Sequence, residues 1–130
     1  MKINYNNEIK EKAKNVVEGY IAALNGRSVP SLEIHLHFPH TRIMLNGEPR
    51  SWDTAREYLD DFQNRLKEDG WHSTELLNVD TEIISKKKCH TRISFKRLRR
   101  DGTSINIYQS LYVITEKNKS WGILLGSGTG

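Results

Sequence analysis

The chain has 130 residues, of which 36% are hydrophobic and 28% charged, a composition typical of one globular domain. It contains no apolar run close to the ~20 residues that a membrane span needs, and no apolar signal core near its start. We therefore expect a single domain over residues 1–130, in the cytoplasm and not in a membrane. The lone cysteine, Cys89, excludes an internal disulfide and a multi-cysteine zinc site.

The net charge of +4 is concentrated in two short runs, residues 86–88 and 96–100. One interpretation is a phosphate-binding patch for nucleic acid. The other is a solvated hairpin whose lysines deter edge-to-edge aggregation of strands. No aromatic residues alternate with these charges to stack bases, which argues against a nucleic-acid partner.

The first half of the chain predicts two helices with a shorter one between them. Apolar residues recur at three-and-four spacing over residues 8–25, and Gly26 is typical of a helix end. Residues 28–34 predict a short turn of helix with a proline near its start. A further amphipathic helix is predicted over residues 53–68, where Asp69-Gly70 ends it.

The remaining elements are predicted to be strands. Residues 35–45 are rich in β-branched and aromatic side chains and are interrupted or bulged at Pro39. After Trp71 the pattern is antiparallel, with alternation at Cys89, Thr91, Ile93 and Phe95 on one strand. The strands expected there cover residues 77–83, 89–95, 104–115 and 121–127.

This order of elements predicts an α+β fold. Helices gathered in the N-terminal half would pack on one face of a curved, mostly antiparallel sheet. The result would be a cone that is open at one end and offers a pocket between the helices and the sheet.

Several strings resemble the NTF2-like superfamily, in particular its SnoaL-like and ketosteroid-isomerase-like members. They are VVEGYIAALNGRSVPSL, NGEPRSW followed by AREYLDDF, and SLYVITEKNKSWGILLGS. A narrower resemblance is to uncharacterised bacterial members with the strings HFPH-x-R-I, GWH and SLYV-x-T. Together these cover nearly the whole chain and imply the NTF2-like (cystatin-like) cone.

The resemblance can be compared with ketosteroid isomerase chemistry, which uses a tyrosine and a neutral acid as an oxyanion hole and an aspartate as base. Tyr20 falls at the position of the tyrosine. The acid position falls near Gln109, and the base position on Ile43 or Met44, which cannot accept a proton. Isomerase chemistry by the family's own residues is therefore not expected.

A predicted pairing of Thr115 with Trp121 decides which side chains face the pocket. Cross-strand partners share a face, so this register would place Gln109, Trp121 and Leu125 inside the cone. Tyr108 and Tyr112 would then cover the outer face, where they would either form a homodimer interface or cap the sheet edge of a monomer. From the second long helix and its flanks, the expected pocket residues are Trp52, Tyr58, Phe62, Trp71 and His72.

The segment HLHFPHTRIML, residues 35–45, raises three alternatives for its histidines. His35 and His37 could be metal ligands, although Pro39 breaks their register with His40. His37 or His40 could instead exchange a proton while Tyr20 stabilises an oxyanion. The third alternative is a structural hydrogen bond where the strand bends.

We therefore expect a domain that binds a small, partly hydrophobic organic molecule, with no metal and no cofactor. Proton transfer of the isomerase, dehydratase or cyclase type, by His37, His40 and Tyr20, is one hypothesis for its function. The alternative is a non-catalytic module for ligand binding or dimerisation. Whether the protein is an enzyme stays open at this point.

Overall fold

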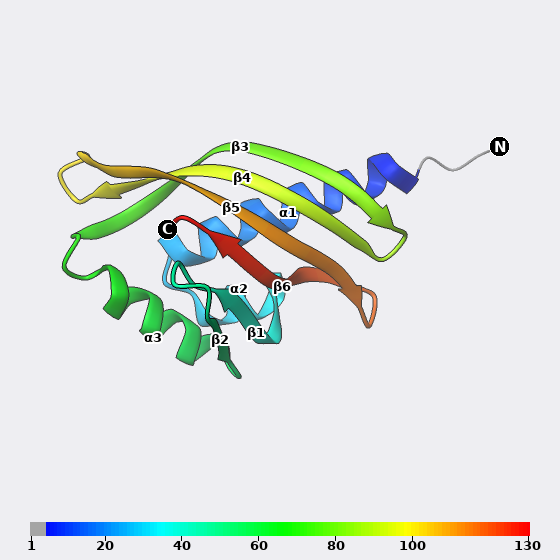
Figure 1. Ribbon diagram of the computed structural model, residues 1–130, viewed down its shortest axis with the longest axis horizontal. Coiled ribbons are helices and arrows are strands. Elements are labelled where there is room, and N and C mark those ends of the chain that lie inside the picture. The colour runs from blue at the N-terminus through cyan, green and yellow to red at the C-terminus, as the bar shows by residue number, and fades with distance from the viewer. Residues whose placement is uncertain (1–4) are drawn as a thin grey trace.

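The computed structural model describes residues 5–130, which form three helices and one sheet (Figure 1). The helices are α1 (Tyr5–Asn25), α2 (Val29–His35) and α3 (Ala55–Leu66). The strands are β1 (Leu36–Ile43), β2 (Pro49–Trp52), β3 (Trp71–Ser85), β4 (Lys88–Arg99), β5 (Ser104–Lys117) and β6 (Ser120–Gly128).

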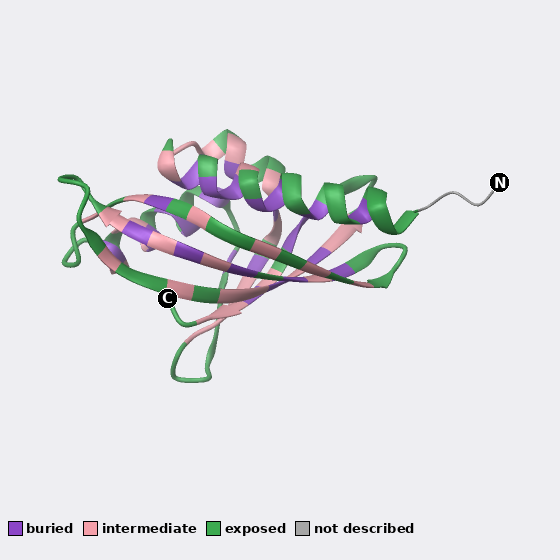
Figure 2. Ribbon diagram, turned by 90° about the horizontal axis from the view of Figure 1, so that it is seen from above, coloured by how far each residue is buried: buried purple, intermediate pink, exposed green. Residues whose placement is uncertain are grey.

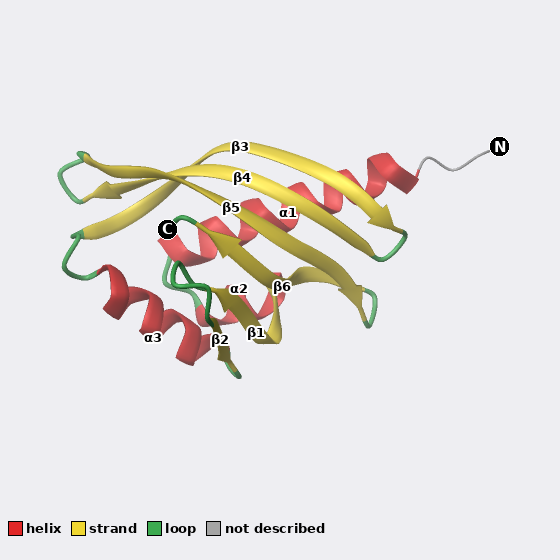
Figure 3. Cartoon of the chain, in the orientation of Figure 1, coloured by secondary structure: helices red, strands yellow, loops and turns green. Residues whose placement is uncertain are grey.

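The six strands lie in the order β2-β1-β6-β5-β4-β3. The β1–β6 pair is parallel and the other pairs are antiparallel. The sheet is curved, and the helices lie on one of its faces (Figure 3). The buried residues of α1 face this sheet, as Figure 2 shows. The predicted α+β cone is thus confirmed.

The local predictions hold for most elements. The short helix after residue 28 is α2, and the Ser28 side chain caps it by accepting a hydrogen bond from Ser31 N at 3.2 Å. The irregularity predicted at Pro39 is present as a register shift of β1 against β6, between Leu36 and Thr41. The sequence did not predict β2, which has four residues, three of them exposed, and hence no long alternation. None of the helices within residues 5–130 is long and apolar enough to cross a membrane.

The predicted register of the last hairpin is wrong. Trp121 pairs with Glu116, and the register then shifts between Val113 and Ile114. Because Glu116, and not Thr115, lies opposite Trp121, the even-numbered residues of β5 face inward, and the extra residue Leu124 exchanges the two faces of β6 beyond it. As a result Tyr112 is buried on the inner face, with 2% of its surface exposed.

The core lies between the helices and the inner face of the sheet. Each element contributes the apolar side chains of one face, which is the arrangement that the helical and strand periodicities predict. Burying each of these large side chains stabilises the fold by about 1.5–3 kcal/mol. Examples are Val17 and Leu24 of α1, Leu32 of α2, Leu59 of α3, and Ile93, Ile114 and Ile123 of the sheet.

Leu32 is fully buried, so Leu32→Ala leaves a cavity between α2 and the sheet. We predict a loss of about 2–5 kcal/mol in the free energy of unfolding, measured by urea denaturation. Leu45→Ala is the matched control, since Leu45 is 76% exposed, and it should change this free energy by less than about 0.5 kcal/mol. Equal losses in the two variants would contradict the position of α2 in the core.

Candidate functional site

A cavity of about 40 Å³ lies between α1, α3 and the inner face of the sheet. Its walls carry three arginines and three tyrosines, besides apolar side chains: Arg42, Arg65, Arg97, Tyr20, Tyr58 and Tyr112. Of the described residues, no aspartate or glutamate lines it. The cavity is therefore positively charged and lined by hydrogen-bond donors.

Arg42 reaches the cavity from β1 because it lies two residues after His40, and alternate residues of a strand share a face. Gly126 on β6 pairs with both Arg42 and Tyr112. A Cβ atom on Gly126 would lie 2.8 Å from Arg42 Cδ and 3.0 Å from Tyr112 Cδ1. The absence of a side chain at Gly126 thus makes room for the arginine.

Two hydrogen bonds hold the guanidinium group in place. Arg42 Nε donates to His40 Nε2 at 2.7 Å, and Arg42 Nη2 donates to Tyr20 Oη at 3.0 Å. The group also lies over the rings of Tyr20, Tyr58 and Tyr112, with its carbon 5.0 to 5.4 Å from their centroids. These contacts fix its orientation without neutralising its charge.

His40 is the support of Arg42. It is fully buried, its Nδ1–H donates to the carbonyl oxygen of Ile123 at 3.1 Å, and its Nε2 accepts from Arg42. Burial, and then the positive charge of Arg42, lower the pKa of the imidazole to about 2. His40 is therefore neutral, and both of its ring nitrogens are engaged.

The hydroxyls of Tyr20 and Tyr58 form a polar cluster with Arg42 and His40. The hydroxyls of Tyr20 and Tyr58 share a short hydrogen bond. Burial raises the pKa of Tyr20 despite Arg42, and burial raises the pKa of Tyr112 to about 12. The hydroxyls of Tyr20 and Tyr112 thus keep their protons at neutral pH. Only one proton of the Tyr20–Tyr58 pair is used in their mutual bond, so the other can be donated to an acceptor in the cavity.

The three arginines differ in their partners. Arg65 Nε bonds to Asp61 Oδ2 at 2.9 Å, and Asp61 also pairs with Arg50 at 3.1 Å. Arg42 and Arg97 make no ion pair with any residue of the described chain. An arginine has five N–H donors, and Arg42 uses one with His40 and one with Tyr20. Donors therefore remain for an anionic ligand.

The histidines of the segment 35–45 are all engaged structurally. The ring of His35 lies against Gly19, and the ring of His37 lies against Gly122 while its Nε2 bonds to the carbonyl oxygen of Thr115 at 2.8 Å. Of these histidines only His40 contacts the polar cluster, and it does so from behind Arg42. Within residues 5–130 no three metal-ligating side chains gather at one point.

The other predicted pocket residues divide into two groups. Tyr20, Tyr58 and Phe62 line the cavity. The expected placement is wrong for Gln109 and Leu125, because the hairpin register turns them to the outer face; Gln109 is exposed. His72 is exposed too, and its carbonyl oxygen accepts from Arg27.

The three tryptophans support the structure around the cavity. Trp52 is buried and packs against Tyr58, with ring centroids 5.0 Å apart. Trp71 packs edge-on against Phe62 at 5.0 Å. Trp121 is partly buried against the core. Their predicted part in ligand binding would therefore be indirect.

The homodimer was expected to form through Tyr108 and Tyr112 on the outer face. Both tyrosines instead face the inner side, since Tyr112 packs edge-on against Tyr20 and Tyr108 stacks on Phe95. The predicted face of these tyrosines is wrong because Trp121 pairs with Glu116 and not with Thr115, which shifts the register by one residue. A homodimer stays a prediction without these residues.

Sequence reasoning missed Arg42, Arg97 and Tyr112, although a signal for the arginines exists. Arg97 continues by two residues the alternation of Ile93 and Phe95 on β4, so period two places it on the inner face. Its charged neighbours instead predict a surface patch over residues 96–100, to which Arg97 belongs in the sequence.

Comparison with known proteins agrees with this architecture. The model of an NTF2-like protein family, DUF6841, matches residues 8–127. The chain belongs to this family. No curated protein matches the sequence.

Solved structures share the fold at low sequence identity. An NTF2-like protein from Cytophaga hutchinsonii ATCC 33406 is 16% identical, with 98% of this chain and 99% of that chain covered and a TM-score of 0.69. An NTF2-like protein with a cystatin-like fold from Novosphingobium aromaticivorans is 14% identical, with 93% and 80% covered and a TM-score of 0.72. A hexachlorocyclohexane dehydrochlorinase (LinA) Type2 is 11% identical, with 96% and 86% covered and a TM-score of 0.71. Some relatives of this fold are thus enzymes, and the likeness itself extends to the fold alone.

The low pKa of His40 predicts that stability falls in mild acid. The unfolded chain protonates this histidine below about pH 6.5, whereas the folded chain keeps it neutral down to about pH 2. The free energy of unfolding is therefore not reduced by protonation of His40 well above pH 6.5. It falls by about 1.5 kcal/mol between pH 6.5 and pH 5, because protonation of His40 stabilises only the unfolded chain there.

Urea denaturation at these two pH values measures the effect. His40→Gln should lose about 1.5 kcal/mol less stability than the wild type over this interval. His72→Gln, at an exposed histidine, should behave as the wild type. An unchanged pH dependence in His40→Gln would contradict the account of a buried neutral imidazole.

Proposed function

We propose that the protein binds a small organic anion, such as a carboxylate, through Arg42 and the tyrosine hydroxyls. The single observation that carries this proposal is that the guanidinium of Arg42 lies in the cavity wall with no acidic partner in the described chain. A half-buried charge without a counter-ion is costly, and an anionic ligand would supply one. Arginine also binds a carboxylate through two parallel hydrogen bonds.

The size and the lining of the cavity narrow the class of ligand. A volume of about 40 Å³ is far below the roughly 300–1,000 Å³ of pockets for drug-sized ligands. Ile21, Leu24 and Phe62 provide apolar walls beside the charged group. These features favour a compact, partly apolar carboxylate over a steroid-sized molecule.

Binding has more support than proton transfer. A general base has to accept a proton, and the described side chains that line the cavity include no aspartate, glutamate or histidine. His40 lies behind Arg42 with both nitrogens engaged, and His37 is bonded to a backbone carbonyl. The geometry therefore favours the non-catalytic alternative, in which the fold holds a ligand.

The proposal predicts that Arg42→Met weakens the binding of a carboxylate probe. Hydrogen bonds to a charged group contribute about 1.5–3 kcal/mol, so the dissociation constant of propanoate should rise at least about tenfold. Isothermal titration calorimetry at pH 7 and low ionic strength measures this constant.

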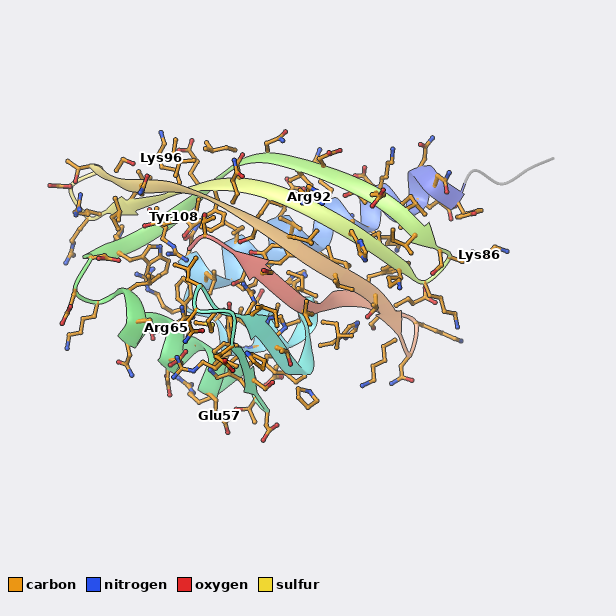
Figure 4. All side chains as sticks on the ribbon, viewed as in Figure 1. Glu57, Arg65, Lys86, Arg92, Lys96 and Tyr108 are labelled. Carbon is orange, nitrogen blue, oxygen red and sulfur yellow. The ribbon has the colours of Figure 1, made fainter. Side chains whose placement is uncertain are left out.

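Arg92→Met is the matched control, because Arg92 is exposed on strand β4 (labelled in Figure 4). It removes the same charge away from the cavity and should bind propanoate as the wild type does. The proposal fails if the wild type does not bind propanoate, or if the two variants lose the same affinity.

A second variant keeps the charge but displaces it. Gly126→Ala places a methyl group 2.8 Å from Arg42 Cδ and 3.0 Å from Tyr112 Cδ1, so these side chains must move, and we expect the hydrogen bond from Arg42 to Tyr20 to be disturbed. We predict a loss of affinity for propanoate comparable to that of Arg42→Met, measured by the same calorimetry. Ser127→Ala, the adjacent position on β6, should leave the affinity unchanged. Normal binding by Gly126→Ala would show that the position of Arg42 is not critical.

A further inference from the structure

A second arginine, Arg97, occupies the same cavity from strand β4. It is buried, with 6% of its surface exposed, and its Nε has no hydrogen-bond partner in the described chain. Nor does its guanidinium make an ion pair there. The buried charge of Arg97 thus has no hydrogen-bond acceptor among the described residues.

Aromatic rings surround this guanidinium group. Its carbon lies 4.5 Å from the centroid of Tyr108, 5.3 Å from that of Phe95 and 5.7 Å from that of Phe62. Cation–π contacts of this kind use the faces of the guanidinium and leave its N–H donors at the edge. The Nε edge is one of the edges through which a guanidinium can bind both oxygens of a carboxylate.

The neighbouring charges of β4 do not share this environment. Arg99 is exposed, and its Nε and Nη1 donate to the carbonyl oxygens of Asp69 and Ser104. Lys96 precedes Arg97 on the opposite face of the strand, since successive residues alternate. Arg97 is therefore distinct from the exposed basic run to which it belongs in the sequence.

Arg42 and Arg97 lie at two positions along one cavity. Arg42 lies over Tyr112, and Arg97 lies over Tyr108 of the same strand, β5. A separation of four residues corresponds to ~13 Å between the Cα atoms of the two tyrosines, at ~3.3 Å per residue. Both arginines line the same cavity, so a ligand with two anionic groups has an arginine available for each.

We propose that Arg97 is a second anion subsite and that the ligand is a compact dicarboxylate. One carboxylate binds Arg42 and the tyrosine hydroxyls, and the other binds the edge of Arg97. This inference rests on the proposed function, since it adds a second contact to the same anion site. A second carboxylate would account for the positive charge among Phe62, Phe95 and Tyr108, where burying an apolar side chain would require less free energy.

The test compares acids that differ by one carboxylate. Malonate is compared with propanoate, and succinate with butanoate, by calorimetry on the wild-type protein at pH 7 and low ionic strength. At least one dicarboxylate is expected to bind at least tenfold more tightly than its matched monocarboxylate. Arg97→Met should reduce the affinity for that dicarboxylate to the level of the monocarboxylate, with little effect on the monocarboxylate itself.

Arg92→Met again controls for the loss of one positive charge on β4 and should retain the preference. Thermal unfolding separates a structural role from a binding role. Without ligand, the unfolding midpoint of Arg97→Met should equal or exceed that of the wild type, since a buried unpaired charge is removed. In the wild type, the dicarboxylate should raise this midpoint more than the monocarboxylate does.

The outcomes distinguish this inference from the proposed function. If monocarboxylates bind through Arg42 but dicarboxylates bind no more tightly, the second subsite is refuted and the proposed function stands. If Arg97→Met weakens both acids equally, the separate subsite is likewise refuted. If the wild type binds none of the four acids, both proposals fail together. The wild-type comparison decides even if Arg97→Met does not fold.

Discussion

The hydrogen bond from Arg42 to His40 is the interaction on which the arrangement of the cavity depends. It couples the position of a permanent charge to a buried imidazole that is itself fixed by the backbone carbonyl of Ile123. A neutral imidazole with its proton on Nδ1 can accept at Nε2, and a protonated one cannot. The neutrality of His40 is thus a condition for holding Arg42 against Tyr20.

Close packing around this pair makes the arrangement specific. Gly126 leaves space for the stem of Arg42, and the edge-on contact of Tyr112 with Tyr20 closes the cluster. The tyrosine rings face the cation and their hydroxyls supply donors, so the cluster stabilises a positive charge while still offering hydrogen bonds to an acceptor. Such a site is complementary to an anion and poorly suited to a neutral apolar ligand.

Placing both Arg42 and Arg97 in the cavity wall has an electrostatic cost. Two arginines in one cavity repel each other, and each loses hydration without gaining an acidic partner. A protein selected for stability alone would place apolar side chains there. The anion that we propose to bind between Arg42 and Arg97 would offset both the repulsion and the lost hydration.

The sequence predicts the fold well because helix and strand periodicity report burial directly. The stripe of α1, the alternation of β4 and the strings shared with NTF2-like proteins all led to the observed architecture. The site was harder to predict because it depends on register. The pairing of Trp121 with Glu116 in place of Thr115 reverses the faces predicted for Gln109 and Tyr112, and a bulge at Leu124 of β6 reverses that of Leu125. No local pattern in the sequence marks that bulge.

The arginines were overlooked for a different reason. Arg97 continues the alternation of its strand, and Arg42 follows His40 by two residues. Since every second residue of a strand shares a face, both arginines are expected on the inner face of the sheet. Charge normally indicates exposure, and this expectation outweighed the periodicity. A charged residue at a position that the strand pattern assigns to the interior is thus a signal of function.

The most direct test of the account is a crystal structure of the protein soaked in 3-bromopropanoate, with anomalous scattering used to locate the bromine. The account predicts a bromine peak inside the cavity, with the carboxylate hydrogen-bonded to Arg42 and Tyr20. Bromine peaks confined to exposed arginines, with an unoccupied cavity, would contradict the central claim that Arg42 is an anion-binding group.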